Sequence, residues 1–118
     1  MQLSLASRSN GVSHVDWRGR ITQRDLSPFS DPLADLLGAD AFGKPVLLNL
    51  QEVEIIDSSG VSYLLTCHKK FREAGGKLVL HSVSPLAAGV FKVLNLTQVF
   101  CLAEDEASAL RLVEGDTT

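Results

Sequence analysis

The stretch that decides the fold of this chain is Ile55-Ile56-Asp57-Ser58-Ser59-Gly60. A β-branched apolar run stops there at an acid, two hydroxyl side chains and a glycine, and a helical pattern begins directly afterwards. The first turn of a helix has unpaired backbone N–H groups and the positive end of the helix dipole, both of which favour negative charge. A phosphate on a serine at this position would add a charge of about −1.5 to −2 at neutral pH. The stretch therefore predicts a strand-to-helix junction that is suited to a negative charge.

The residues that follow the junction predict a helix from Ser58 to Ala74. Its apolar positions recur with the i, i+3, i+4, i+7 spacing of an amphipathic helix: Val61, Leu64, Leu65, His68 and Phe71. Gly75-Gly76 ends it, because glycine readily adopts the left-handed C-cap conformation. Further along we expect a strand at 77–81, a helix from Pro85 through Leu94 with Asn95 as its cap, a strand at 99–102 and a last helix to about Val113, opened by the acids Glu104, Asp105 and Glu106.

The residues before the junction predict a hairpin, a short helix and a central strand. Asn10-Gly11 is a strong hairpin signal between a strand containing Leu3 and Leu5 and a strand from Val12 to Arg18, which Gly19 is expected to end. Ser27-Pro28 and Asp31-Pro32 each resemble a helix cap followed by proline. We expect a helix at 32–37 closed by Gly38, a loop at 38–45, a strand at 45–50 and a polar interruption at 51–54.

This order of elements, β-β-α-β-α-β-α-β-α, predicts a single α/β domain. Helices that alternate with strands favour parallel neighbours joined by right-handed crossovers, and the opening hairpin adds antiparallel pairing. We therefore expect one domain over residues 1–118, with its core at about 10–113. Its sheet should be mixed and mostly parallel, with an N-terminal antiparallel hairpin.

Composition excludes several classes of function. The net charge is −3 and the basic residues are scattered, which argues against a nucleic-acid surface. No apolar stretch approaches the roughly 18 residues of a membrane helix, so we expect no membrane partner. Cys67 and Cys101 have no metal-type spacing and are expected to be small buried side chains in a reducing cytosol, rather than a disulfide. The sequence thus favours a cytoplasmic globular protein.

The chain resembles the STAS domain of anti-sigma factor antagonists from about residue 10 to residue 110. The resemblance lies in Val46-Leu47-Leu48-Asn49-Leu50 followed by the junction at 55–60. It continues through Gly75-Gly76-Lys77-Leu78-Val79-Leu80, Ser84-Pro85, Val90-Phe91 and Leu94. The most specific part is Asp-Ser-Ser-Gly between strand and helix, because a motif is confirmed by its structural context.

The resemblance implies a protein-binding switch. In such families, a partner kinase that also holds a sigma factor phosphorylates the serine after the aspartate, which here is Ser58, with Ser59 as a secondary candidate. The unphosphorylated antagonist binds the kinase and frees the sigma factor, and a phosphatase resets it. The implied partner-binding residues are Asp57, Ser58, Ser59, Gly60, Arg20 and Thr22. We expect Gly60 to leave room for a partner's backbone.

Two positions depart from the family's pattern. Where the family usually has an acid, an aliphatic residue and aspartate after the glycine that ends the second strand, this chain has Gly19-Arg20-Ile21-Thr22. Such a loop tends to flank the phosphorylation site, so a basic Arg20 would change which partner is recognised. Ser62 stands where the family often has glycine.

The same residues have three other interpretations besides a phosphorylation switch. Asp and Ser are common helix caps, so the motif alone is compatible with a purely structural role. A scaffold or adaptor in a signalling or transport assembly would use the same surface without phosphorylation. A hydrolase would need a base and an orienting acid, and no motif surrounds the histidines. We expect no enzymatic activity, no cofactor and no metal, and either a monomer or a weak homodimer.

Overall fold

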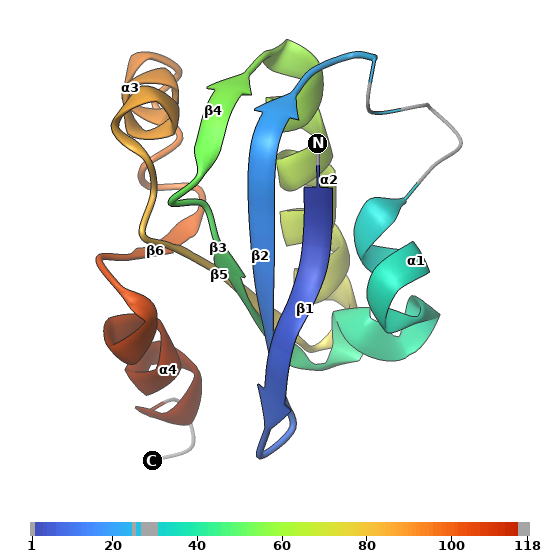
Figure 1. Ribbon diagram of the computed structural model, residues 1–118. Coiled ribbons are helices and arrows are strands. Elements are labelled where there is room, and N and C mark those ends of the chain that lie inside the picture. Colours follow the sequence, from blue (N-terminus) through green and yellow to red (C-terminus); the bar gives the residue numbers. More distant parts are fainter. Residues whose placement is uncertain (1, 25, 27–30, 116–118) are drawn as a thin grey trace.

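The computed structural model describes residues 2–24, 26 and 31–115 (Figure 1). The described strands are β1 (Gln2–Ser9), β2 (Val12–Ile21), β3 (Pro45–Asn49), β4 (Val53–Ile56), β5 (Lys77–His81) and β6 (Cys101–Ala103). The described helices are α1 (Pro32–Leu37), the 3₁₀ helix η1 (Ala39–Gly43), α2 (Ser58–Ala74), α3 (Pro85–Val93) and α4 (Glu106–Gly115). No helix in this described part has both the length and the apolar character needed to cross a membrane.

The described strands form one mixed sheet in the order β1-β2-β3-β5-β6, and β4 pairs with β2 beyond the end of β3. β1 and β2 are antiparallel around the Asn10-Gly11 turn, whereas β2, β3, β5 and β6 run parallel, as does β4 with β2. The expected α/β class, with a mostly parallel sheet and an N-terminal hairpin, is confirmed.

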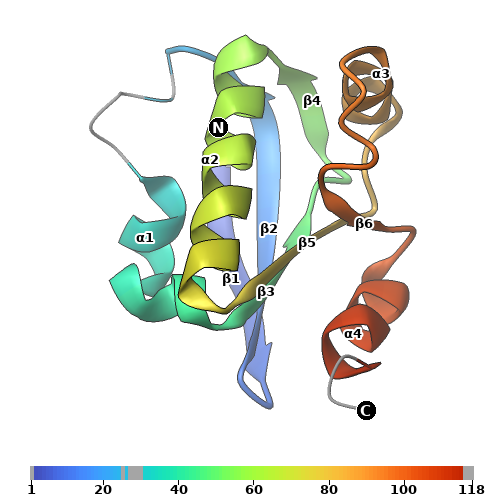
Figure 2. The ribbon, with the colours of Figure 1, turned by 180° about the vertical axis from the view of Figure 1, so that it is seen from behind.

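The two faces of the sheet bury unequal cores. α1, α2 and α3 supply buried side chains to a large cluster that also contains Val15, Trp17, Leu48 and Leu80. Seen from behind, α2 lies across this face (Figure 2). The opposite face has a small cluster, in which Ala109 of α4 packs against Val12, Leu47 and Val79. This division follows from the period of a strand, because neighbouring residues such as Leu47 and Leu48 point to opposite faces.

Two expectations about the strands are wrong. β2 does not end at Gly19 but continues to Ile21. Gly19 adopts a φ of +88°, and the register of the pairing with β4 shifts between Gly19 and Arg20, so the glycine bends the strand instead of ending it. This irregularity lets β2 leave β3 and pair with β4. The stretch from Val53 to Ile56 is therefore a separate strand, and the described sheet has six strands rather than the expected five. Its partner lies more than thirty residues earlier, so local patterning does not reveal the pairing.

Other boundaries also differ from expectation. Residues 39–43 form the 3₁₀ helix rather than a loop. β6 begins at Cys101 instead of Val99, which is 43% exposed. α4 begins at Glu106, and Asp105 lies before the helix, where its side chain accepts a hydrogen bond from the Ser108 N–H. α3 ends one residue before Leu94, and Asn95 follows with a positive φ. The Asp31-Pro32 helix start is confirmed, whereas Ser27-Pro28 lies outside the described residues.

Gly76 should be one of the least replaceable residues of the scaffold. An added Cβ would meet backbone atoms of the segment before β3: the Phe42 oxygen, and the oxygen and nitrogen of Lys44 at 2.6 and 2.7 Å. We expect Gly76→Ala to lower the free energy of unfolding by about 3 kcal/mol, measured by urea denaturation. Gly43→Ala is the control, since its Cβ would have only an ordinary contact at 3.5 Å. Equal effects of the two substitutions would contradict the packing described here.

Candidate functional site

Asp57 organises the junction between β4 and α2. Its Oδ1 accepts hydrogen bonds from the backbone N–H groups of Ser59 (2.9 Å) and Gly60 (3.1 Å), so Asp57 is the N-cap of α2. Its Oδ2 accepts from the N–H of Gln23 at 3.0 Å, and its own N–H donates to the oxygen of Ile21 at 3.1 Å. One side chain thus caps the helix and holds the chain that leaves β2.

Ser58 is the first residue of α2 and is exposed, whereas Ser59 is half-buried. Because Asp57 provides the side-chain cap, the capping interpretation of the motif applies to Asp57 rather than to Ser58. The Ser58 side chain therefore lies at the positive end of a 17-residue helix without being the residue that caps it.

The expected role of Gly60 as a gap for a partner's backbone is wrong. Gly60 is buried, and a Cβ there would lie 2.7 Å from Cγ2 of Ile21, 2.7 Å from Cγ1 of Ile56 and 3.1 Å from the oxygen of Ile21. Glycine is needed because the first turn of α2 packs directly on the ends of β2 and β4. The residue shapes the site from beneath, and its missing side chain makes room for Ile21 and Ile56 of the same domain.

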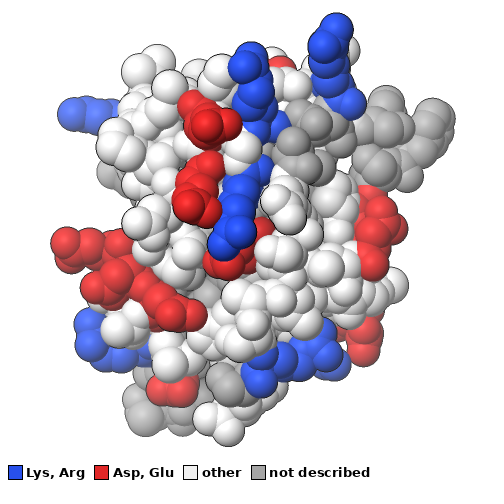
Figure 3. Space-filling view, viewed as in Figure 1, with Lys and Arg blue, Asp and Glu red and all other residues white. Residues whose placement is uncertain are grey.

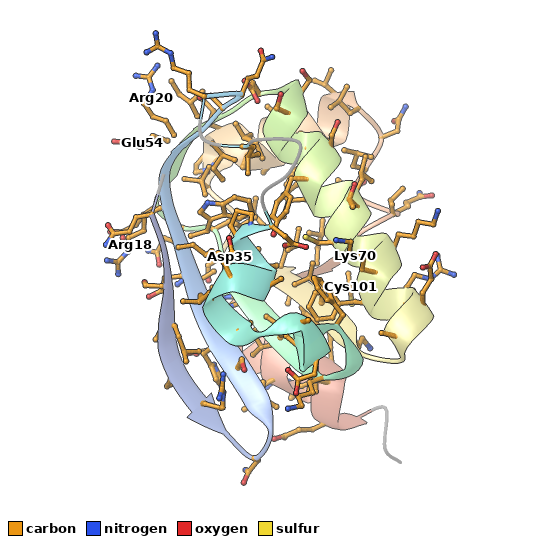
Figure 4. The ribbon with its side chains drawn as sticks, turned by 90° about the vertical axis from the view of Figure 1, so that its right-hand side faces the viewer. Arg18, Arg20, Asp35, Glu54, Lys70 and Cys101 are labelled. Atoms are coloured by element: carbon orange, nitrogen blue, oxygen red, sulfur yellow. The ribbon has the colours of Figure 1, made fainter. Side chains whose placement is uncertain are left out.

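The segment expected to flank the site is partly strand. Arg20 pairs with Ile55 inside the sheet, whereas Thr22, which is half-buried, and Gln23 follow the end of β2, where the Gln23 N–H donates to Asp57. Arg20 points away from α2, as do Arg18 and Glu54 (Figure 4). Basic and acidic side chains are mixed on this face of the molecule (Figure 3). The structure thus brings Thr22 close to the junction, and places Arg20 on the other face of the sheet from α2.

A polar network that sequence reasoning missed fixes α1 against α2. The Tyr63 hydroxyl donates to Asp31 Oδ1 at 2.6 Å and accepts from the Leu33 N–H at 2.9 Å, and Lys70 Nζ lies 2.8 Å from Asp31 Oδ2. Burial opposes ionisation of Asp31, but the hydrogen bonds from Lys70, Tyr63 and Ala34 outweigh it and lower the pKa of its carboxyl. The only sequence signal was Asp31 as a cap, because its partners lie 32 and 39 residues further along the chain.

The cysteines and His68 have environments that suit packing better than catalysis. Burial raises the pKa of the Cys67 thiol to about 12, so this thiol stays protonated and unreactive at neutral pH. Cys101, expected to be buried, is half-buried, and both thiols are free. His68, on the apolar face of α2, is half-buried, and its ring lies edge-on to that of Phe100 with 5.9 Å between the ring centroids.

Comparison with known families identifies this architecture. The family described as "Mlab, STAS domain" matches residues 5–112. The chain belongs to the STAS domain family. This match confirms the resemblance to STAS domains that the residues at 55–60 indicated, and it covers almost the whole chain.

Solved STAS structures share the fold at low sequence identity. TM1081 of Thermotoga maritima, a candidate anti-sigma factor antagonist, has a TM-score of 0.80 at 19% identity over 92% of each chain. An anti-sigma factor antagonist from Mycobacterium paratuberculosis gives 0.71 at 23% identity, over 96% of this chain and 95% of its own. The anti-sigma factor antagonist SpoIIAA in its unphosphorylated form gives 0.69 at 22% identity, over 97% of this chain and 96% of its own. At these identities the likeness shows the STAS fold alone.

Gly60→Ala should destabilise the domain from inside the junction. We expect a loss of about 1–3 kcal/mol, because the new methyl group overpacks Ile21 and Ile56. Gly89→Ala is a matched control in α3, where an added Cβ meets nothing within 4 Å and helix propensity should stabilise by up to about 1 kcal/mol. Both are measured by thermal unfolding, and a Gly60→Ala protein as stable as wild type would refute the close packing.

Asp57 and Ser58 should differ sharply in their contribution to stability. Asp57→Ala removes the acceptor of three backbone N–H groups and should cost about 1–2 kcal/mol. Ser58→Ala should change stability by less than about 0.5 kcal/mol, because the side chain is exposed. Urea denaturation of the two variants checks this. A larger loss of stability in Ser58→Ala than in Asp57→Ala would mean that Ser58 rather than Asp57 caps the helix.

Proposed function

We propose that this STAS domain is an anti-sigma factor antagonist whose binding to a partner anti-sigma kinase ends when that kinase phosphorylates Ser58. The supporting observation is the separation of roles at the junction. Asp57 holds the helix start, and Ser58 stands exposed beside it at the end of a rigid helix. A modification of Ser58 therefore changes the surface without removing a structural contact made by Asp57.

The chemistry of a phosphate at Ser58 favours loss of binding. Asp57 already accepts from the N–H groups of Ser59 and Gly60, so the phosphate would compete with a carboxylate for these donors. Two negative groups at one helix end repel each other, and burying them in a protein interface carries a desolvation penalty. Each tenfold loss of affinity needs only about 1.4 kcal/mol, so a single phosphate suffices to change partners.

Exposed apolar side chains near the junction support a protein partner. Ile55, which lies on β4 two residues before Asp57, is 36% exposed, and α3 packs beside β4. On and just after α3, Leu86 is 48%, Val93 80% and Leu94 50% exposed. These side chains offer apolar contact area to a partner, and contiguous apolar patches are typical of interaction sites rather than of polar catalytic clefts. In this proposal the protein has no turnover of its own, and its partners are the kinase and the phosphatase that resets it.

The second candidate is an adaptor that binds a larger assembly without phosphorylation. The matched family's description names Mlab rather than an anti-sigma factor antagonist. Arg20 also departs from the acid that the antagonists usually have. In this alternative the same junction binds its partner constitutively, and Ser58 is an ordinary exposed residue.

Intact mass spectrometry of the protein from its native cells separates the two candidates. The proposal predicts a species with the added mass of one phosphate that disappears after phosphatase treatment and is absent from Ser58→Ala. Ser59→Ala is the matched control and should keep the phosphate. Wild type and Ser58→Asp are then compared as baits, and Ser58→Asp should lose the kinase partner.

Two results would refute the switch. One is a protein without phosphate under every growth condition that still binds its partner. The other is equal partner binding by wild type, Ser58→Ala and Ser58→Asp. Both results would favour the constitutive adaptor.

A further inference from the structure

Gly89 lies in the middle of α3, and nothing inside this chain requires a glycine there. Glycine inside a helix is unfavourable relative to alanine, because its backbone loses more conformational freedom on folding. Gly60 and Gly76 are needed because an added Cβ would collide with neighbouring segments, whereas a Cβ at Gly89 would meet nothing within 4 Å. Gly89 also does not have a positive φ. The domain itself thus gains nothing from this glycine, but a molecule that packs against α3 gains a hollow.

The face of α3 around Gly89 is apolar and exposed. Leu86, Val90 and Val93 share this face with Gly89, because the four positions follow the i, i+3, i+4, i+7 spacing of a helix. Leu86 is 48% and Val93 80% exposed, and Val90 is half-buried. These four residues are called the α3 stripe. The opposite side of the helix is buried in the large core, so α3 has apolar residues on both sides, as is usual for a helix that is covered on both.

The position of α3 leaves the stripe open to a second molecule. Figures 1 and 2 both show α3 at the edge of the domain, beside β4 and on the opposite side from α1. Lys92 is the one charged residue of this nine-residue helix, and it lies beside the stripe rather than on it. The occupant of the stripe therefore has to offer apolar side chains and has no charge to neutralise.

The α3 stripe is complementary to itself. Its spacing is the same when read in either direction, so a second α3 that runs antiparallel about a two-fold axis places one stripe on the other. In the register that does this, Leu86 of each copy lies beside Val93 of the other, and Val90 enters the hollow at Gly89. A large side chain then meets a small one, and each contact occurs twice.

The residues that flank the stripe fit the same register. Leu94 is 50% exposed and follows the helix, and it would lie beside the exposed Pro85 at the start of the other α3. Lys92 falls opposite position 87 and not opposite its own copy, so like charges do not meet. The register thus gives an apolar neighbour to each large exposed apolar side chain on and just after this helix.

We propose that α3 is a self-association site through which two copies of this chain pair about a two-fold axis. The helix spans only about 14 Å. A stable interface covers about 800 Å² on each partner, so this pairing is weak and depends on concentration. It needs neither Ser58 nor a kinase, and it stands or fails independently of the phosphorylation switch. A partner that takes the same side chains of α3 competes with it.

Sedimentation equilibrium of the whole chain tests the pairing. The average mass of wild type should rise toward twice that of one chain between about 10 µM and about 1 mM, the range in which a weak interface forms. Val93→Asp should weaken self-association tenfold or more, because the two-fold contact buries two carboxylates against apolar side chains. It should leave thermal stability unchanged, since Val93 is largely exposed. Leu112→Asp is the matched control: Leu112 is also an exposed apolar residue, but it lies on α4, so this variant should pair as wild type does.

Gly89→Ala separates the interface from the fold. The added methyl group should raise the thermal stability of the domain, because alanine is the better helix former and nothing in the chain obstructs it. The same methyl group occupies the hollow that Val90 of the other copy would enter, so self-association should weaken several-fold. A purely structural role for Gly89 does not give opposite changes in the two measurements.

Disulfide cross-linking tests the register. Under mild oxidation, a double variant with Leu86→Cys and Val93→Cys should form covalent dimers, because each new thiol lies beside its counterpart on the other copy. Either substitution alone should not, since identical positions lie seven residues apart along antiparallel helices, or about 10 Å, which is beyond the reach of a disulfide. The single variants also control for reaction of the free thiol of Cys101.

Four outcomes would overturn the proposal. They are wild type that stays a monomer at every concentration, self-association that Val93→Asp does not weaken, self-association that Gly89→Ala does not weaken, and single cysteine variants that cross-link as well as the double variant. If wild type is a monomer and Val93→Asp instead loses a different protein captured from native cells, the stripe belongs to that partner and the self-association site is refuted.

Discussion

The carboxylate of Asp57 joins the start of α2 to the chain that leaves β2, and the position of the candidate site depends on it. One oxygen satisfies two backbone donors at the start of α2, and the other holds the chain leaving β2 through Gln23. Such donors have no partner inside the helix, so a buried helix start without this side chain would be costly. Because Asp57 does this, Ser58 is left at the surface for another use, and Gly60 is pressed against Ile21 and Ile56.

The unequal faces of the sheet divide the domain into a strongly and a weakly held part. Long apolar side chains from α1, α2 and α3 fill one face, so this part should open only with the whole fold. On the other face α4 covers a few small side chains and relies on contacts from His14 and Lys77. The proposed switch at Ser58 lies on the rigid part, where added charge changes recognition rather than structure.

The mixed surface charges bear on partner choice. Arg20 lies in β2 with its side chain on the face opposite α2, near Glu54, and not in a loop around Ser58 (Figure 4). A partner that contacts Ser58 and the apolar side chains of α3 would meet Arg20 if it also covered Ile55 of β4, because Arg20 and Ile55 are cross-strand neighbours. Whether Arg20 takes part in binding therefore distinguishes a small interface at the start of α2 from a larger interface that also includes the sheet.

Local sequence determined the elements and the motif. The 3.6-residue period of α2, the alternation in β3 and β5, the hairpin turn and the caps at Asp31 and Gly75 are properties of neighbouring residues, and the structure agrees with them. The same patterning predicted the α/β class and the strand-to-helix junction. Only the tertiary structure decided that β4 is a separate strand, that Gly60 faces inward, and that His14 and His81 are buried. Each of these depends on contacts between residues far apart in the chain, and the sequence pattern of one segment does not specify which distant segment will cover it.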